Sequence, residues 1–255
     1  MNLKDKVALI TGAGSGLGEA TAHELASHGA KIAIVDLPSS GGEKVARKLS
    51  PNALFATADV ASPGEMESAI AAVVGRFATV HVLVNCAGIG RAQRTISKEG
   101  PASLEVFNKV IQVNLIGTFN AIRLAAVQMA KNDPNLDGER GVIINTASVA
   151  AYEGQIGQAA YSASKGGVVG MTLPIARDLS SLGIRVCTIA PGLFLTPMMM
   201  SLPEEAQKSL GAQVPFPPRL GDPKEYAQLA MSIVENHMLN GETIRLDGAI
   251  RMAPR

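Results

Sequence analysis

Val7-Ala-Leu-Ile-Thr-Gly-Ala-Gly-Ser-Gly-Leu-Gly18 is an apolar run that leads into a glycine-rich turn, and an alanine-rich stretch follows it. This order predicts a strand, a tight turn and then a helix. Gly12, Gly16 and Gly18 let the chain turn and let the backbone approach a pyrophosphate, which would face the free amide groups at the helix start. The spacing G-x-x-x-G-x-G departs from the usual G-x-G-x-x-G, whose third glycine would stand at Leu17. The segment therefore predicts a nucleotide-binding turn at the end of a strand.

The rest of the chain alternates apolar strands with helical stretches, which is typical of a parallel sheet covered by helices on both faces. We expect a single-domain, Rossmann-like, doubly wound α/β fold over 1–255, because no linker or repeat divides the chain. Helices are expected to begin after Ser62, where Ser-Pro-Gly-Glu has the pattern of a capping box, and after Ser103, where a long helix runs toward Met129. The seven predicted strands are 7–10, 31–36, 53–57, 80–84, 141–147, 185–190 and 242–245.

Charge and composition exclude several classes of partner. The chain carries 23 basic and 22 acidic residues, a net charge of +1, so it has no bulk field to hold nucleic acid. No apolar run is expected to span a bilayer, and the two cysteines, Cys86 and Cys187, have no metal-like spacing, so we expect neither a membrane partner nor a metal site. The first predicted strand starts a few residues after Met1, which leaves no room for a signal or transit peptide. We therefore expect a cytoplasmic protein, or a mitochondrial matrix protein if its source is eukaryotic.

Tyr161 and Lys165 lie four residues apart in Tyr-Ser-Ala-Ser-Lys, which puts both side chains on one face of a helix. A free phenol titrates near pH ~10, too high for a base at neutral pH, but a nearby ammonium group favours the phenolate. The pair therefore predicts Tyr161 as a general acid or base whose pKa Lys165 lowers. The alternative is that the two residues only decorate a helix, since this spacing is common by chance.

Further motifs follow in a fixed order. Asn85-Cys-Ala-Gly88 comes after the strand 80–84, Asn114 lies in Val-Asn-Leu, Ser148 follows the strand 141–147, and Pro191-Gly192 follows the strand 185–190. Together with the glycine turn and Tyr161 and Lys165, these motifs resemble the short-chain dehydrogenase/reductase family. Cys86 departs from the family's pattern, which has a second Asn there.

The resemblance implies a catalytic tetrad. Tyr161 would move the proton, Lys165 would also bind the cofactor ribose, Ser148 would hold the substrate oxygen, and Asn114 would support a water relay to solvent. From the residues alone, Ser148 could be an ordinary serine at a strand end, and Asn114 a polar helix residue bonded to its own backbone.

Asp36 ends the second predicted strand, roughly 20 residues after the glycine turn, where an acidic side chain accepts hydrogen bonds from the adenosine ribose and repels a 2′-phosphate. This position predicts NAD rather than NADP as the cofactor. Asp36 could instead be a turn residue, and Asp59 could simply lead into the next helix. The resemblance places the cofactor against Gly12, Ser15, Gly16, Leu17, Gly18, Asp36, Asp59, Val60, Asn85, Ala87, Gly88, Tyr161, Lys165, Pro191 and Gly192.

An apolar, methionine-rich segment, Leu193-Phe-Leu-Thr-Pro-Met-Met-Met200, opens a region over 191–220 that we expect to form a lid above the cofactor. Methionine side chains adapt to irregular ligands, so the lid suits an acyl chain or a steroid, although these residues could equally pack in a subunit interface. The expected substrate contacts are Ser148, Gln155 and Tyr161. Gln155 could bond a thioester carbonyl or only face solvent.

A narrower resemblance concerns the substrate. Asp36-Leu-Pro and the segments 141–150, 166–178 and 248–252 are similar to the branch of the family that interconverts 3-hydroxyacyl-CoA and 3-ketoacyl-CoA in fatty acid metabolism, which is also described as a mitochondrial 17β-hydroxysteroid dehydrogenase. The resemblance implies that activity and a homotetramer. The enzyme alternatives are a hydroxysteroid or secondary-alcohol dehydrogenase, and a ketoacyl carrier-protein reductase, against which Asp36 argues. An alternative of another class is a structural subunit of an RNA-processing complex, which the near-neutral charge does not support.

Overall fold

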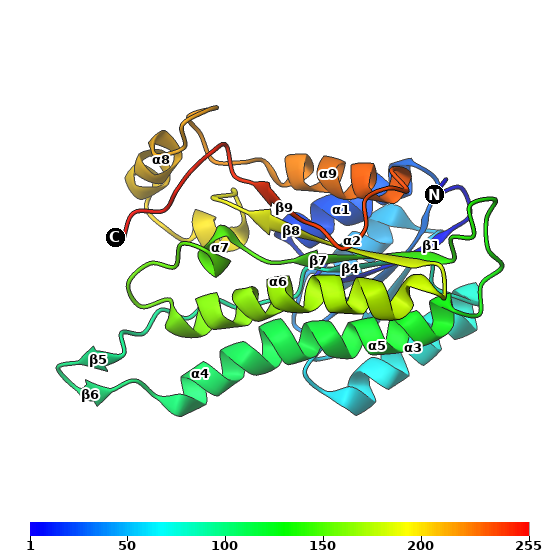
Figure 1. Ribbon diagram of the computed structural model, residues 1–255, viewed down its shortest axis with the longest axis horizontal. Helices are drawn as coiled ribbons and strands as arrows, with labels where there is room; N and C mark the ends of the chain where they lie inside the picture. Colours follow the sequence, from blue (N-terminus) through cyan, green and yellow to red (C-terminus); the bar gives the residue numbers. More distant parts are fainter. Residues whose placement is uncertain (255) are drawn as a thin grey trace.

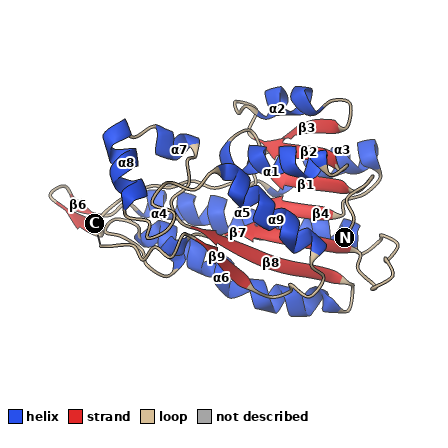
Figure 2. Cartoon of the chain, turned by 90° about the horizontal axis from the view of Figure 1, so that it is seen from above, coloured by secondary structure: helices blue, strands red, loops and turns tan. Residues whose placement is uncertain are grey.

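The computed structural model describes residues 1–254, and for Met198 it describes the backbone alone. Its main sheet has seven parallel strands in the order β3-β2-β1-β4-β7-β8-β9, which Figure 2 shows from above. The chain runs outward in one direction from β1 and then in the other from β4, so the doubly wound α/β fold is confirmed. The strands are β1 (Val7–Thr11), β2 (Lys31–Asp36), β3 (Ala53–Thr57), β4 (Val82–Asn85), β7 (Gly141–Thr146), β8 (Ile184–Pro191) and β9 (Thr243–Leu246).

Helices cover both faces of the sheet (Figure 1). One layer contains α1 (Gly16–Ser27), α2 (Gly42–Leu49) and α9 (Pro223–Glu235). The other contains α3 (Pro63–Phe77), the continuous helical segment made of α4 (Leu104–Ile111), η1 (Gln112–Ile116) and α5 (Gly117–Met129), and α6 (Ala159–Ser180). The short helices η2 (Val149–Ala151), α7 (Pro197–Met200) and α8 (Glu204–Ala212) lie toward one end of the sheet.

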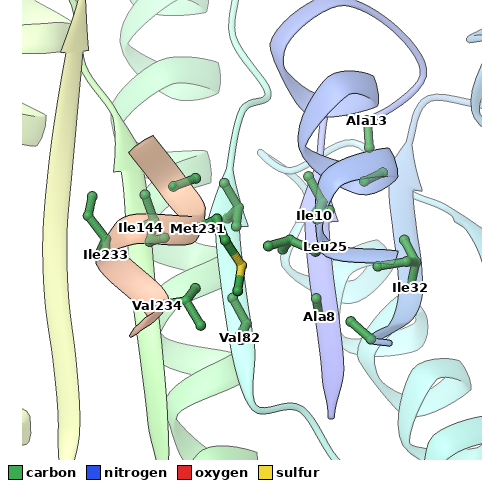
Figure 3. Close-up of a cluster of buried hydrophobic side chains, with 14 of the residues drawn as sticks. Ala8, Ile10, Ala13, Leu25, Ile32, Val82, Ile144, Met231, Ile233 and Val234 are labelled. Atoms are coloured by element: carbon green, nitrogen blue, oxygen red, sulfur yellow. The ribbon is translucent and has the colours of Figure 1, made fainter. Parts of the chain in front are cut away.

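The sheet separates two apolar cores, because neighbouring side chains of a strand point to opposite faces. On β1, Ala8 and Ile10 pack against the α1 and α9 layer, whereas Val7 and Leu9 pack against the other layer. Figure 3 shows the first core, where Leu25 of α1 and residues of α9 meet the sheet. Full burial of one such leucine or isoleucine contributes about 1.5–3 kcal/mol, so these two cores stabilise the scaffold.

Two predicted helix starts are confirmed. The hydroxyl of Ser103 accepts a hydrogen bond from the backbone N–H of Val106 at the start of α4. Ser62 caps α3, with its hydroxyl 3.5 Å from the backbone N of Glu65. The capping box expected there is incomplete, because the Glu65 carboxylate accepts from the backbone N–H of Asp59 at 2.8 Å. A complete capping box, made by Asp222 and Glu225, begins α9 instead.

The helical segment Leu104–Met129 corrects one expectation from the sequence. A window of 18 residues within it has a mean hydropathy of 1.4, and by length and composition alone the segment could cross a membrane, so the expectation that the chain has no such stretch was wrong. Its apolar window is 56% buried within the protein, where the segment packs against the sheet and α6. Many of the apolar residues of this segment are therefore part of the protein's own core.

The sequence also did not predict a small antiparallel hairpin, β5 (Ile96–Ser97) with β6 (Gly100–Pro101). Figure 1 shows it projecting beyond the end of α4, on the side where α7 and α8 lie. Each of the seven main strands lies within two residues of its predicted position.

Candidate active site

The carboxyl ends of the parallel strands meet at one edge of the sheet, and a cavity of about 880 Å³ lies there. This edge, between β1 and β4, is where the strand order reverses, which is the usual ligand site of a doubly wound sheet. The predicted site residues that line the cavity are Gly12, Ser15, Gly16, Leu17, Gly18, Asp36, Asp59, Val60, Ala87, Gly88, Ser148, Gln155, Tyr161, Lys165, Pro191 and Gly192.

The glycine turn is closely packed. Gly12 has a φ of +67°, and a Cβ there would lie 2.6 Å from the backbone N of Ala87. A Cβ at Gly18 would lie 2.4 Å from the carbonyl oxygen of Gly12, so neither position has room for a larger residue. Ser15 precedes α1 in extended conformation, and among the described residues no side chain caps this helix. The amide groups at the start of α1 therefore face the cavity free to bind an anion such as a pyrophosphate.

Asp36 stands at the end of β2 with its carboxylate held by two backbone donors. Oδ2 accepts from the N–H of Gly14 at 2.8 Å, and Oδ1 accepts from the N–H of Leu37 at 2.7 Å. A carboxylate has about four acceptor positions, so each oxygen can still accept from a ligand hydroxyl. The turn role and the ribose role are thus compatible at this residue.

Asp59 and Val60 line the cavity after β3. The Asp59 carboxylate accepts from the N–H of Ala61 at 2.9 Å and lies 3.5 Å from Nζ of Lys109. The Asp59 side chain therefore does stabilise the turn before α3, which is the alternative interpretation given above. The contact of Asp59 and Val60 with the cofactor remains a prediction.

Tyr161 lies in the first turn of α6, and Lys165 follows one turn later. Burial raises the pKa of Tyr161, and a hydrogen bond with Ser148 lowers it in part. The expectation that Lys165 lowers the pKa of Tyr161 is therefore not met in this structure, because burial dominates. Lys165 itself is buried, and burial lowers its pKa from 10.5 to about 8. Its Nζ donates to the carbonyl oxygen of Thr146 at 2.7 Å and lies 5.8 Å from the centre of the Tyr161 ring.

Asn114 lies behind the cavity wall and does not line it. It sits in the π-helical turn η1, fully buried, and its Nδ2 donates to the carbonyl oxygen of Ile89 at 2.9 Å and to Oγ of Ser164 at 3.0 Å. Its Oδ1 accepts from the N–H of Ile89 at 2.8 Å. Asn114 therefore joins the loop after β4 to α6, and its predicted role in a water relay is not tested by these contacts.

Asn85 is not among the residues that line the cavity, and its contact with the cofactor remains a prediction. It is buried in the sheet, where its Nδ2 donates to Oδ1 of Asn145 at 2.9 Å, and Thr11 Oγ1 donates to its Oδ1 at 3.5 Å. Asn85 stands directly opposite Thr11 of β1 and Asn145 of β7, so its side chain bonds along the sheet on the face that these residues share. Ala87 and Gly88, which follow it, form the cavity wall.

Comparison with known proteins decides the family. The sequence profile of the short chain dehydrogenases matches residues 6–207. The chain belongs to the short-chain dehydrogenase family. As a member of this family it is an oxidoreductase. The human protein named 3-hydroxyacyl-CoA dehydrogenase type-2 is 60% identical over 255 residues, which cover 99% of this chain and 98% of the human one.

Two solved structures are similar to this short-chain dehydrogenase over nearly its whole length. The crystal structure of 3-hydroxyacyl-CoA dehydrogenase type-2 from Mycobacterium avium has a TM-score of 0.94 at 44% identity and covers 98% of each chain. The structure of 3-ketoacyl-(acyl-carrier-protein) reductase from Brucella melitensis complexed with NADH has a TM-score of 0.88 at 33% identity. It covers 98% of this chain and 100% of the other. Both likenesses therefore cover nearly the whole fold.

A buried cluster beside Lys165 was not predicted. The hydroxyl groups of Thr146 and Tyr226 lie 2.7 Å apart, and the thiol of Cys86 lies 3.6 Å from Thr146 Oγ1 and 3.8 Å from Tyr226 Oη. Burial raises the pKa of the Cys86 thiol and of the Tyr226 phenol, so both stay protonated. Tyr226 comes from α9, far along the chain, and no local pattern in the sequence indicates this contact.

Part of the segment 191–220, which was predicted to form a lid, lines the cavity. Leu193, Phe194, Pro197, Met199 and Leu202 line it. Leu195 and Met200 are exposed instead, and the side chain of Met198 lies outside the described part of the structure. The predicted apolar lid therefore contributes part of its residues to the cavity wall.

Gln155 lines the cavity, but part of its hydrogen-bonding capacity is in use. Its Nε2 donates to the carbonyl oxygen of Ala253 at 3.1 Å, and its backbone N–H donates to Oε1 of Gln158 at 3.0 Å. A bond from Gln155 to a thioester remains a prediction.

Proposed function

We propose that this short-chain dehydrogenase interconverts 3-hydroxyacyl-CoA and 3-ketoacyl-CoA with NAD as its cofactor. The observation that carries the proposal is 60% identity to human 3-hydroxyacyl-CoA dehydrogenase type-2 along almost the whole chain. The cavity supports it, because Ser148, Tyr161 and Lys165 meet there beside an apolar lid. A hydroxyacyl ester needs this combination of a proton-transfer group and an apolar wall.

The reaction assigns one task to each polar group. The Ser148 hydroxyl holds the substrate oxygen, and the Tyr161 oxygen takes the hydroxyl proton during oxidation or returns it during reduction. NAD, when bound, supplies or accepts the hydride. Lys165 would bind the cofactor ribose, and its Nζ, 5.8 Å from the centre of the Tyr161 ring, places a cation near the proton-transfer group. Asn114 holds the loop after β4 against α6 and so positions the cavity wall.

The donor set of the cavity fits NAD. The free amide groups at the start of α1 suit a pyrophosphate, and the carboxylate of Asp36 suits a ribose with two free hydroxyls. The same carboxylate would repel the 2′-phosphate of NADP. The similar Brucella melitensis reductase complexed with NADH is consistent with this choice.

We also propose that the dehydrogenase is a homotetramer, as the family resemblance implies. The helices α4, α5 and α6 carry large apolar side chains that are exposed in the single chain, namely Leu104, Phe119, Val127 and Leu173. Covering such side chains by other copies of the chain would remove apolar area from water. A monomeric mass by light scattering at micromolar concentration would reject this assembly.

Turnover measurements test the proposed function. The rates of NAD reduction with 3-hydroxyacyl-CoA esters, 17β-hydroxysteroids and simple secondary alcohols should show the highest kcat/KM for the CoA esters. Tyr161→Phe, which keeps the ring but deletes the hydroxyl, is the control for background rates. A clear preference for a steroid or an alcohol would replace the substrate assignment, and failure with all three would reject it.

A further inference from the structure

The segment that follows β9 folds back over the loop that leads to Tyr161. Gly248 and Ala249 have φ angles of +59° and +67°, and this left-handed pair turns the chain. Ile250 is then buried at 2% exposure, so the turn is held in the core. In Figure 1 the segment after β9 runs toward the end of the molecule where α7 and α8 lie.

Glu153 binds this segment through its carboxylate. It accepts two hydrogen bonds from the Arg245 guanidinium, at 2.8 and 3.1 Å, and one from the backbone N–H of Met252 at 3.2 Å. Arg251 adds an ion pair at 3.3 Å, and Arg245 also donates to the carbonyl oxygen of Ile250 at 3.1 Å. The hydrogen bonds from Arg245 hold the pKa of Glu153 below its ordinary value, so this carboxylate remains charged.

Two further bonds join the segment to the same loop. The side-chain amide of Gln155 donates to the carbonyl oxygen of Ala253 at 3.1 Å, and the backbone N–H of Ile156 donates to the carbonyl oxygen of Pro254 at 3.0 Å. Residues 252–254 are therefore bound to residues 153–156 by successive contacts. This alignment fixes where the Met252 side chain points.

Met252 lines the cavity together with Gln155, Met199 and Leu202. We propose that Met252 is a specificity-determining residue that contacts the acyl chain of the substrate, and that Glu153 is a positioning residue that holds Met252 in place. The proposal deepens the proposed function and rests on it. Ser148 and Tyr161 bind the reacting end, which all the substrates share, whereas only a longer acyl chain has atoms left to reach an apolar side chain farther along the wall.

The test compares kcat/KM for 3-hydroxybutyryl-CoA and 3-hydroxydecanoyl-CoA with NAD. Met252→Ala should lower kcat/KM for the decanoyl ester by about 10-fold, mainly through KM, because an apolar contact of this size is worth about that factor. The butyryl ester should be unaffected, and Met252→Leu should restore the decanoyl value. Glu153→Gln keeps the size of the side chain but removes its charge. It should likewise lower kcat/KM for the decanoyl ester and leave kcat/KM for the butyryl ester unaffected.

Met238→Ala is the matched control, because Met238 is 90% exposed and does not line the cavity. Equal losses for both esters in Met252→Ala and Glu153→Gln would show a general structural effect and overturn the proposal, as would no loss for either. If the wild-type enzyme oxidises neither ester, the proposed function is rejected and this proposal with it. That result differs from the others because it appears before any substitution is made.

Discussion

The choice between NAD and NADP depends on one carboxylate, and Asp36→Ala tests it. In the structure Asp36 accepts from the N–H groups of Gly14 and Leu37, at 2.8 and 2.7 Å, which fixes its charge at the cavity wall. The substitution would remove both the acceptor for the ribose and the negative charge. It would also leave the N–H of Gly14 free to donate to a phosphate.

Two separate effects determine how much the substitution should change the preference for NAD over NADP. A hydrogen bond to a charged group contributes about 1.5–3 kcal/mol, so kcat/KM for NAD should fall by about 10- to 100-fold. Two unit charges about 5 Å apart, at an effective dielectric constant of about 20, repel each other by about 3 kcal/mol, so removing the carboxylate should favour NADP by a further factor of about 100. The ratio of kcat/KM for NAD to kcat/KM for NADP should therefore fall by about 10³- to 10⁴-fold in total.

Steady-state kcat/KM values with both cofactors, at a fixed saturating substrate concentration, measure this preference. Asp36→Asn is the matched variant, because it keeps an oxygen acceptor and removes only the charge; its preference should narrow by about 100-fold. A preference for NAD that is unchanged in Asp36→Ala would show that another residue selects the cofactor, and the reasoning from Asp36 would be refuted.

Three further predictions concern proton transfer, ionisation and stability. Tyr161→Phe should lower kcat by at least about 100-fold while the dissociation constant of NAD, from fluorescence titration, stays near the wild-type value; retention of a tenth of the rate would contradict the assigned role. Because burial lowers the pKa of Lys165 to about 8, its ammonium is lost above that pH, so KM for NAD should rise above about pH 8 in a pH series. Stability should change in the opposite direction to NAD binding. Burying the Lys165 ammonium destabilises the folded protein below about pH 8, and this penalty disappears as the folded protein loses the proton. The contribution of Lys165 to the free energy of unfolding should therefore rise between about pH 8 and 10.5. Tyr226→Phe removes the 2.7 Å partner of the Thr146 hydroxyl and should lower the free energy of unfolding by about 1–2 kcal/mol in thermal denaturation, whereas an unchanged Tm would show that this buried pair contributes nothing.

The sequence predicted the sheet well because strands, glycine turns and helix starts follow from neighbouring residues. Val7 and Leu9 point to one face of the sheet and Ala8 and Ile10 to the other, and the structure confirms the predicted helices on both faces, with an apolar core under each layer. The hairpin β5–β6 was missed because each of its strands has only two residues, too few for any periodic pattern.

Within the candidate site, the sequence indicated which residues gather but not which way they face. Asn85 and Asn114 lie at the end of the sheet where the cavity is. Both side chains nevertheless form their hydrogen bonds behind the cavity wall, because their partners come from distant strands and helices. The pKa direction of Tyr161 was also wrong from sequence alone. Burial depends on every element packed around the phenol, and the spacing to Lys165 carries no information about that packing.

The row formed by Thr11, Asn85 and Asn145 has a consequence for how accurately the site is assembled. These residues stand directly opposite one another on β1, β4 and β7, so their polar groups meet only in one register of the three strands. A slip of one residue would move a strand by about 3.3 Å and turn its amide toward apolar neighbours, which carries a penalty of about 1–3 kcal/mol for each unpaired group. The glycine turn, the loop after β4 and Ser148 each follow one of these strands. A buried polar row outside the cavity lining thus sets the relative depth of three cavity walls, so a substitution at Asn85 would disturb the alignment of the site.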